Sequence, residues 1–200
     1  LVLLLVVQHC QKGFMGAFVG MTEPYLYKTY RVPAPQVQIY SSVTSLPWVM
    51  KPIIGLVSDV LPVFGYKKAP YMLFTSVFCA AACLVLGLAP HAVVSVTGLV
   101  ICLFVINLQF STCDLLSEAK YAEKIRMRPE RGPALLTFVW FGMQVGGLFA
   151  TLASGPTVHF AGPKIPYLVA ALPALLVMLP VASGYLEEHW TSPDEARATR

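Results

Sequence analysis

The sequence has 200 residues, of which 56% are hydrophobic and 12% charged, with a net charge of +4 and a mean hydropathy of +0.67. A typical soluble domain carries about 25% charged residues, so this composition excludes an ordinary soluble protein. The apolar residues fall into long runs, which is typical of a chain that crosses a membrane. We expect membrane lipid as a partner and no nucleic acid.

Six apolar segments have roughly the 17–25 residues that a membrane-spanning helix requires. They lie at about residues 1–21, 36–58, 71–90, 92–116, 133–155 and 165–185. Pro47 and Pro52 would break a soluble helix, but neighbouring helices in a membrane bundle can satisfy the freed backbone groups. The sequence therefore predicts an all-α membrane protein with a six-helix transmembrane bundle over residues 1–186.

Lysine and arginine are unevenly distributed between the two sides of this bundle. If residue 1 starts on the cytoplasmic side, nine basic residues lie in cytoplasmic segments and three on the opposite side. The positive-inside rule then places both the amino end and the segment after the sixth span in the cytoplasm, in a membrane that the sequence does not name. Six helices with both ends on one side suit one half of a twelve-helix transporter. We therefore expect residues 187–200 to begin a central cytoplasmic linker, and a carboxy-terminal half-bundle to follow.

Two blocks of sequence carry the most specific pattern. The first is Pro47-Trp48-Val49-Met50-Lys51-Pro52, followed by Gly55, Asp59 and Gly65-Tyr66-Lys67-Lys68, and the second is Asp114-Leu115-Leu116-Ser117-Glu118-Ala119-Lys120-Tyr121-Ala122-Glu123. Both blocks resemble signatures of the folate–biopterin transporter family, and the likeness covers most of residues 1–186. The resemblance implies the amino-terminal half-bundle of a major facilitator fold. It also implies a secondary transporter that moves folate, biopterin or a related pterin by alternating access.

The likeness to the general facilitator motif is incomplete. Gly65 follows Asp59 by six residues, a longer spacing than the general motif has, and Val60 stands where that motif has a basic residue. The longer spacing suits the folate–biopterin branch. Some relatives in that branch carry S-adenosylmethionine, so that solute is an alternative substrate, and a non-transporting membrane scaffold or receptor is an alternative of another class.

Lys51 and Asp114 are charged residues within predicted spans. A charge there costs roughly 2.5–3.5 kcal/mol on insertion scales, so each needs a partner or a ligand. Lys51 lies eight residues before Asp59, and Asp114 lies six before Lys120, so the two side chains reach similar depths. We predict that they can pair, either as part of an anionic substrate site or as a permanent lock between the second and fourth spans.

The first span has a polar stripe in which Gln8 and Lys12 share a helix face. The resemblance places this span at the central cavity, where amides suit a pterin ring and a lysine suits a carboxylate. Lys12 can instead extend to the interface, with Gln8 buried between helices. Trp48 lies three residues from Lys51, and stacking against a substrate is a further hypothesis. The candidate substrate-binding residues are Gln8, Lys12, Trp48, Lys51 and Asp114.

A second candidate set is conformational. Asp59 at a helix end faces a basic turn and could hold the cytoplasmic side closed, although basic residues there also serve as a solvated topology signal. The candidate gating residues are Gly55, Asp59, Gly65, Lys67, Lys68 and Glu118. Glycines at 13, 16, 20, 142, 146, 147 and 155 form small-residue faces suited to close helix packing.

No pattern in the sequence indicates an enzyme. The five cysteines have no metal-ligand spacing, and no glycine loop cradles a phosphate, so we expect no cofactor, no metal and no ATP hydrolysis. Energy for uphill transport would then come from an ion gradient or from exchange. Asp114, Glu118 and Glu23 are the candidate sites for a coupled proton.

Overall fold

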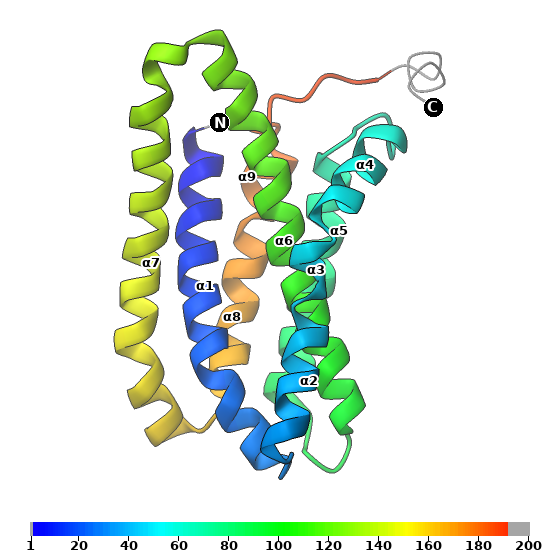
Figure 1. The fold of residues 1–200 in the computed structure, drawn as a ribbon, viewed down its shortest axis with the longest axis vertical. Helices are drawn as coiled ribbons and strands as arrows, with labels where there is room; N and C mark the ends of the chain where they lie inside the picture. The colour runs from blue at the N-terminus through cyan, green and yellow to red at the C-terminus, as the bar shows by residue number, and fades with distance from the viewer. Residues whose placement is uncertain (1, 192–200) are drawn as a thin grey trace.

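A computed structural model describes residues 2–191, which form an all-helical bundle with no strand among them (Figure 1). The elements are α1 (Val2–Thr29), α2 (Ala34–Thr44), α3 (Leu46–Val49), α4 (Lys51–Val60), α5 (Ala69–Leu88), α6 (Val96–Met127), η1 (Pro129–Arg131), α7 (Gly132–Ala161), α8 (Ile165–Leu176) and α9 (Met178–Ala182). Five helical segments are long and apolar enough to cross a membrane. The predicted all-α membrane protein is confirmed. Arg197 and Arg200, counted among the cytoplasmic charges, lie outside the described residues.

The segment at 36–58 is interrupted, which is why it is absent from those five. It consists of α2, α3 and α4, joined at Ser45 and Met50. Pro47 and Pro52 each stand in the first turn of the helix that follows the break. Proline is tolerated in the first turn of a helix because a backbone N–H at that position would have no acceptor within the helix. The same lack of an N–H prevents proline from continuing the backbone hydrogen bonds of the preceding helix.

Two helices extend past the predicted spans. α1 continues through Pro24 to Thr29, and α6 has 32 residues, or about 48 Å at 1.5 Å per residue. A bilayer core is about 30 Å thick, so the last turns of α6 project beyond it. Residues 117–127, expected to lie in the connection, continue this helix because they are rich in the strong helix formers Ala, Glu and Lys.

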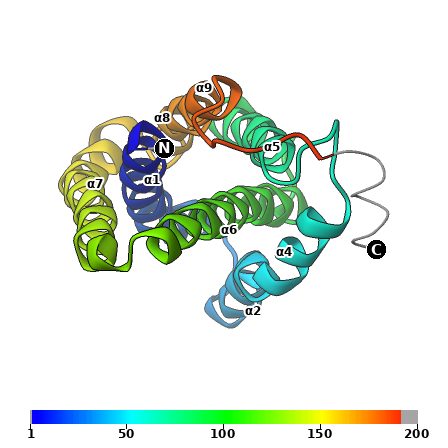
Figure 2. The ribbon, with the colours of Figure 1, turned by 90° about the horizontal axis from the view of Figure 1, so that it is seen from above.

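α6 occupies the middle of the bundle (Figure 2). α2, α3 and α4 pack on one side of it, and α5 packs on the other side with α8 beyond. α7 is the outermost helix and makes its main contact with α1. Of its most apolar stretch only 17% is buried, so most of its surface faces away from the bundle.

The core has two parts along the bundle axis. The larger is a cluster from α1, α5, α6 and α8 that includes Met15, Cys83, Leu103 and Tyr167. The smaller includes Leu4, Leu116 and Val181 and lies at the upper end of the bundle, where α1 begins and α6 ends (the top in Figure 1). Charged residues lie close to this upper end, and they form the candidate site.

Candidate functional site

One buried carboxylate joins three helices. Asp114 of α6 accepts a hydrogen bond from Lys12 of α1 at Oδ1 and one from Lys51 of α4 at Oδ2, each at 2.6 Å. The predicted Lys51–Asp114 pair is confirmed, and Lys12 is a second partner that the sequence did not indicate. The Asp114 side chain is 3% exposed, whereas the lysines are 20% and 22% exposed. The cationic groups therefore form the accessible side of the cluster.

The break in the second span positions two of these groups. Trp48 lies on α3, and Lys51 is the first residue of α4 beyond the break at Met50. The amine of Lys51 lies 5.0 Å from the centre of the Trp48 ring, and that of Lys12 lies 5.4 Å from it. Both distances suit cation–π attraction. The Trp48 indole N–H donates to Oδ1 of Asn107 on α6 at 3.0 Å, which holds the ring in place.

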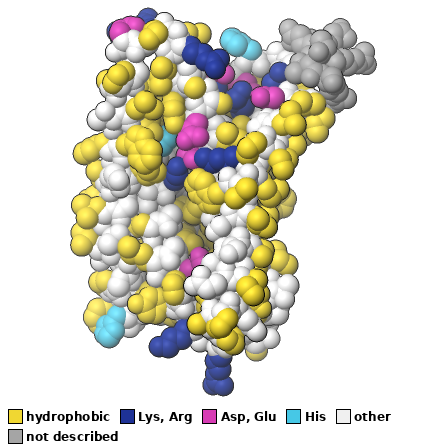
Figure 3. Space-filling model, viewed as in Figure 1, with side chains coloured by type: hydrophobic (Ala, Val, Ile, Leu, Met, Phe, Trp, Pro, Cys, Tyr) yellow, Lys and Arg dark blue, Asp and Glu magenta, His cyan; other side chains and the backbone are white. Residues whose placement is uncertain are grey.

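Glu118 adds a second carboxylate on the accessible side. Its Oε2 lies 3.5 Å from the amine of Lys51, and its side chain is 42% exposed. Figure 3 shows basic and acidic side chains gathered in the hollow between α1 and α4. We call this group the charge cluster: Lys12, Trp48, Lys51, Asp114 and Glu118. It contains four of the five predicted substrate-binding residues, all but Gln8, and one predicted gating residue, Glu118.

Gln8 lies one turn from Lys12 but is only 1% exposed. Its side-chain oxygen has no hydrogen-bond partner among the described residues. The structure therefore places Gln8 inside the bundle, next to the charge cluster rather than on its accessible side. A buried acceptor without a partner is costly, so a bound water or a polar ligand group would be stabilised there.

Other predicted gating residues lie nearer the upper end. Lys68 of the turn before α5 is 3.9 Å from Asp59 of α4 and 3.9 Å from Glu123 of α6. These residues line a cavity of about 410 Å³ between α4 and α6, which Gly55 also borders. Asp59 is 60% exposed, so its ion pair with Lys68 is a weak contact that a small movement of α4 would break.

Gly65 has a structural reason to be glycine. Its φ of +82° is in the left-handed region, and a Cβ there would overlap the indole of Trp190. Thr191 donates its backbone N–H to the carbonyl of Gly65 at 2.8 Å. Residues 187–191, which we call the tail strap, thus cross over the turn that precedes α5. The structure brings Gly65, Lys67 and Lys68 against this strap through backbone contacts.

Glu188 is the main anchor of the tail strap. Its carboxylate accepts the backbone N–H groups of Lys67, Lys68 and Ala69 at 2.7, 2.8 and 3.0 Å. These are free donors at the start of α5, where a negative charge is also favoured by the helix dipole. On the other side of the strap, Lys124 donates to Glu187 at 2.5 Å. This bond lowers the pKa of Glu187, so the contact persists at neutral pH and is lost only in acid, as pH falls through that lowered pKa.

Replacing Glu188 by Ala is expected to lower the free energy of unfolding by about 1–2 kcal/mol, because three helix-start donors lose their acceptor. Glu188→Gln should fall between wild type and Ala. The measurement is thermal unfolding of the purified protein. Glu130→Ala removes the same charge from an exposed residue of η1 and is the control. Equal unfolding temperatures for the Glu188 and Glu130 variants would show that the strap is not anchored in this way.

Sequence reasoning missed three residues of these clusters. Asn107 has a visible signal, since it is an amide in an apolar span, two turns before Asp114 and so on the same face. Glu123 stands in the second block and pairs with Lys120 three residues away, but its contact with Lys68 joins segments far apart in sequence. Glu188 has no such signal, because its partners lie far away in sequence. No group of three metal-ligating side chains occurs within residues 2–191.

Comparison with known proteins identifies a protein family whose sequences match this chain. The BT1 family matches residues 12–199, which is nearly the whole chain and contains both blocks described above. The chain belongs to the BT1 family. The charge cluster, the interrupted second span and the turn before α5 all lie inside the matched region of this BT1 protein. No solved structure matches it.

Curated relatives of this BT1 protein bear transporter names. It is 30% identical to the probable folate-biopterin transporter 6 of Arabidopsis thaliana over 87% of the chain and 35% of that relative. Identity to the probable folate-biopterin transporter 4 of the same plant is 34%, over 70% of the chain and 29% of the relative. Identity to the folate-biopterin transporter of Synechocystis sp. is 25%, over 74% and 29%. The chain spans about a third of the length of these relatives, whose names indicate a transporter and not an enzyme.

Proposed function

We propose that the protein carrying this chain is a secondary transporter that moves folate, biopterin or a related pterin across a membrane by alternating access. The single observation that carries the substrate class is the charge cluster. It presents two lysine amines to the accessible side while their shared carboxylate stays buried. The printed names of the relatives support the same class of solute.

The arrangement favours an anionic or electron-rich solute over S-adenosylmethionine. A sulfonium cation would require an accessible carboxylate without a partner. Asp114 is buried and bonded to both lysines, and the accessible carboxylate of Glu118 lies 3.5 Å from the Lys51 amine. The carboxylates of a folate could replace Asp114 or Glu118 as partners of Lys51 and Lys12 during transport. The Trp48 ring, held by Asn107, supplies an aromatic edge beside the same amines.

The other parts of the proposal concern the transport cycle. The Asp59–Lys68–Glu123 contacts would close one side of the bundle and open when it rocks against a second half-bundle. The distribution of basic residues supports a cytoplasmic location for the upper end, in a membrane that we leave unnamed. Asp114, Glu118 and Glu23 remain the proposed sites of a coupled proton, and lipid would cover the exposed apolar side chains.

The test is uptake of radiolabelled folate and biopterin by cells that express the natural gene product containing this sequence. Lys51→Met is expected to reduce initial uptake at least about tenfold, the equivalent of losing one charged contact of about 1.4 kcal/mol. Surface expression should stay near wild type, because Asp114 keeps Lys12 as a partner. Lys28→Met, an exposed lysine at the far end of α1, is the control and should transport normally.

Each alternative predicts a different pattern. Uptake of neither compound by the unmodified protein would overturn the pterin proposal, and S-adenosylmethionine would be tested next. Normal uptake by the Lys51 variant would leave Lys51 as a structural lock. A scaffold or receptor would show no uptake of any solute, yet would lose partner binding when its loops are altered.

A further inference from the structure

A second polar group lies on the same face of α1 as Lys12, nearer the opposite end of the bundle. Glu23 follows Lys12 by eleven residues, which is close to three helical turns, or about 16 Å along the axis. Its carboxylate accepts a hydrogen bond from the hydroxyl of Ser41 in α2. α2 is the first part of the interrupted second span, and α4, which carries Lys51, is the last. Glu23 and the charge cluster therefore both lie between α1 and the second span.

The stretch of α1 that joins these two groups has no bulky side chain on its exposed surface. Gly16 and Gly20 lie between Lys12 and Glu23, each within about a quarter turn of the same face at 3.6 residues per turn. Both glycines are exposed, and a Cβ on either would meet nothing within 4 Å among the described residues. An extended solute therefore has room to lie along α1 and to contact Lys12 at one end and Glu23 at the other.

Glu23 has few partners for a partly buried carboxylate. Its bond with Ser41 is 3.3 Å long, whereas a typical O–H···O bond measures about 2.7–2.8 Å, and Glu23 has no ion pair among the described residues. The hydroxyl of Tyr27, one turn further along α1, is close enough to interact with this carboxylate but completes no hydrogen bond. Tyr27 is only 1% exposed, and a buried donor without an acceptor is costly. A ligand that offers both donors and an acceptor beside Glu23 would therefore be stabilised.

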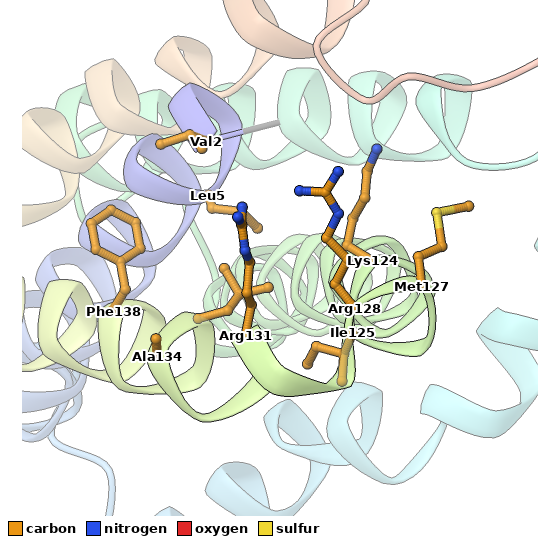
Figure 4. A pocket seen from close by; sticks show the side chains of 10 residues that line it. Val2, Leu5, Lys124, Ile125, Met127, Arg128, Arg131, Ala134 and Phe138 are labelled. Atoms are coloured by element: carbon orange, nitrogen blue, oxygen red, sulfur yellow. The ribbon is translucent and has the colours of Figure 1, made fainter.

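The cavity at the upper end of the bundle has the opposite chemistry. Its volume is about 650 Å³, and Lys124, Arg128 and Arg131 extend together into it above an apolar wall (Figure 4). None of the described residues that line it is acidic. It therefore offers no carboxylate to a group that donates two hydrogen bonds, whereas Glu23 does.

We propose that Glu23, Tyr27 and Ser41, which we call the ring-edge site, bind the 2-amino-4-oxo edge of a pterin ring while Lys12 and Lys51 hold the carboxylates of the same folate molecule. This assignment rests on the proposed function and adds the orientation of the substrate to it. The 2-amino group and the neighbouring ring N–H donate in parallel to the two oxygens of Glu23, in the fork geometry with which a carboxylate also accepts arginine. The 4-oxo group accepts from the Tyr27 hydroxyl, and the long bond from Ser41 is given up.

The experiment compares two ligands by calorimetry on the natural gene product purified in detergent. One is folate, and the other is a folate analogue in which a methyl group replaces the 2-amino group. The unmodified protein is expected to bind folate at least about tenfold more tightly, the equivalent of one charge-assisted hydrogen bond. Glu23→Gln should bind both ligands with nearly equal affinity, because its amide no longer accepts the paired donors. Glu130→Gln removes the same charge from the exposed η1 and should keep the full preference.

Tyr27→Phe is a second variant that does not threaten folding. It removes a hydroxyl that makes no hydrogen bond, so the unfolding temperature should not fall, while folate affinity should drop about fivefold as the 4-oxo group loses its donor. Unchanged folate affinity in this variant would remove Tyr27 from the site.

The remaining outcomes separate the ring-edge site from the proposed function. If the unmodified protein binds folate without preferring it to the 2-methyl analogue, the ring-edge site is refuted and folate transport is not. A Glu23→Gln variant that weakens both ligands equally and keeps the preference would also refute the site, because a coupled proton at Glu23 would have that effect. If the unmodified protein binds neither ligand, the proposed function fails, and the ring-edge site fails with it.

Discussion

Asp114→Asn is expected to reduce both folding and uptake more than any other single change in the charge cluster. It leaves two lysine amines in a membrane bundle without their shared carboxylate. Breaking a buried ion pair by removing one partner costs about 3–5 kcal/mol. We therefore expect a lower unfolding temperature, less protein at the cell surface and uptake below a tenth of wild type, corrected for surface amount.

A charge-balanced variant separates stability from transport. Lys12→Met, Lys51→Met and Asp114→Leu together remove all three charged groups, and apolar replacements of buried ion pairs are often neutral or stabilising. This triple variant should recover the unfolding temperature but not the uptake. Recovery of uptake as well would mean that the three residues only lock α1, α4 and α6 together.

Alanine at Gly146 or at Gly13 is expected to be strongly disruptive, although both positions lie outside the charge cluster. A Cβ on Gly146 would overlap the backbone carbonyl of Cys10 in α1, and one on Gly13 would overlap the carbonyl of Met143 in α7. Neither carbonyl can move without shifting its helix, so α1 and α7 must separate. We expect each variant to lose about 1–3 kcal/mol of unfolding free energy, in the range of other overpacked sites.

The matched control is Gly155→Ala, on the same helix. A Cβ at Gly155 would meet nothing within 4 Å, so this change should leave stability unchanged or raise it slightly through better helix propensity. Thermal unfolding of the purified protein measures all three variants. If Gly146→Ala and Gly155→Ala unfold at the same temperature, the close approach of α1 and α7 is not what holds this pair of helices.

The glycine pattern shows how far a sequence argument extends. The small-residue faces of the first and fifth spans predicted close helix packing, and Gly13 and Gly146 are at the contact. Gly16, Gly20 and Gly155 share the pattern but have open space beside them. Spacing along a helix identifies which residues share a face. It does not say which turn of that face meets the neighbour, because crossing angle and axial shift depend on both helices together.

The sequence by itself determined the all-α membrane class and the long apolar segments, and it indicated that Lys51 and Asp114 could pair. Bilayer thickness dictates segment length, and a buried charge requires a partner at its own depth. Only the tertiary structure decided that Lys12 also bonds Asp114, that Gln8 is buried, and that Glu188 anchors the start of α5. Those contacts depend on the rotation of each helix about its axis and on where the tail crosses the bundle. Both are set by the packing of all the helices at once, which no single segment of sequence contains.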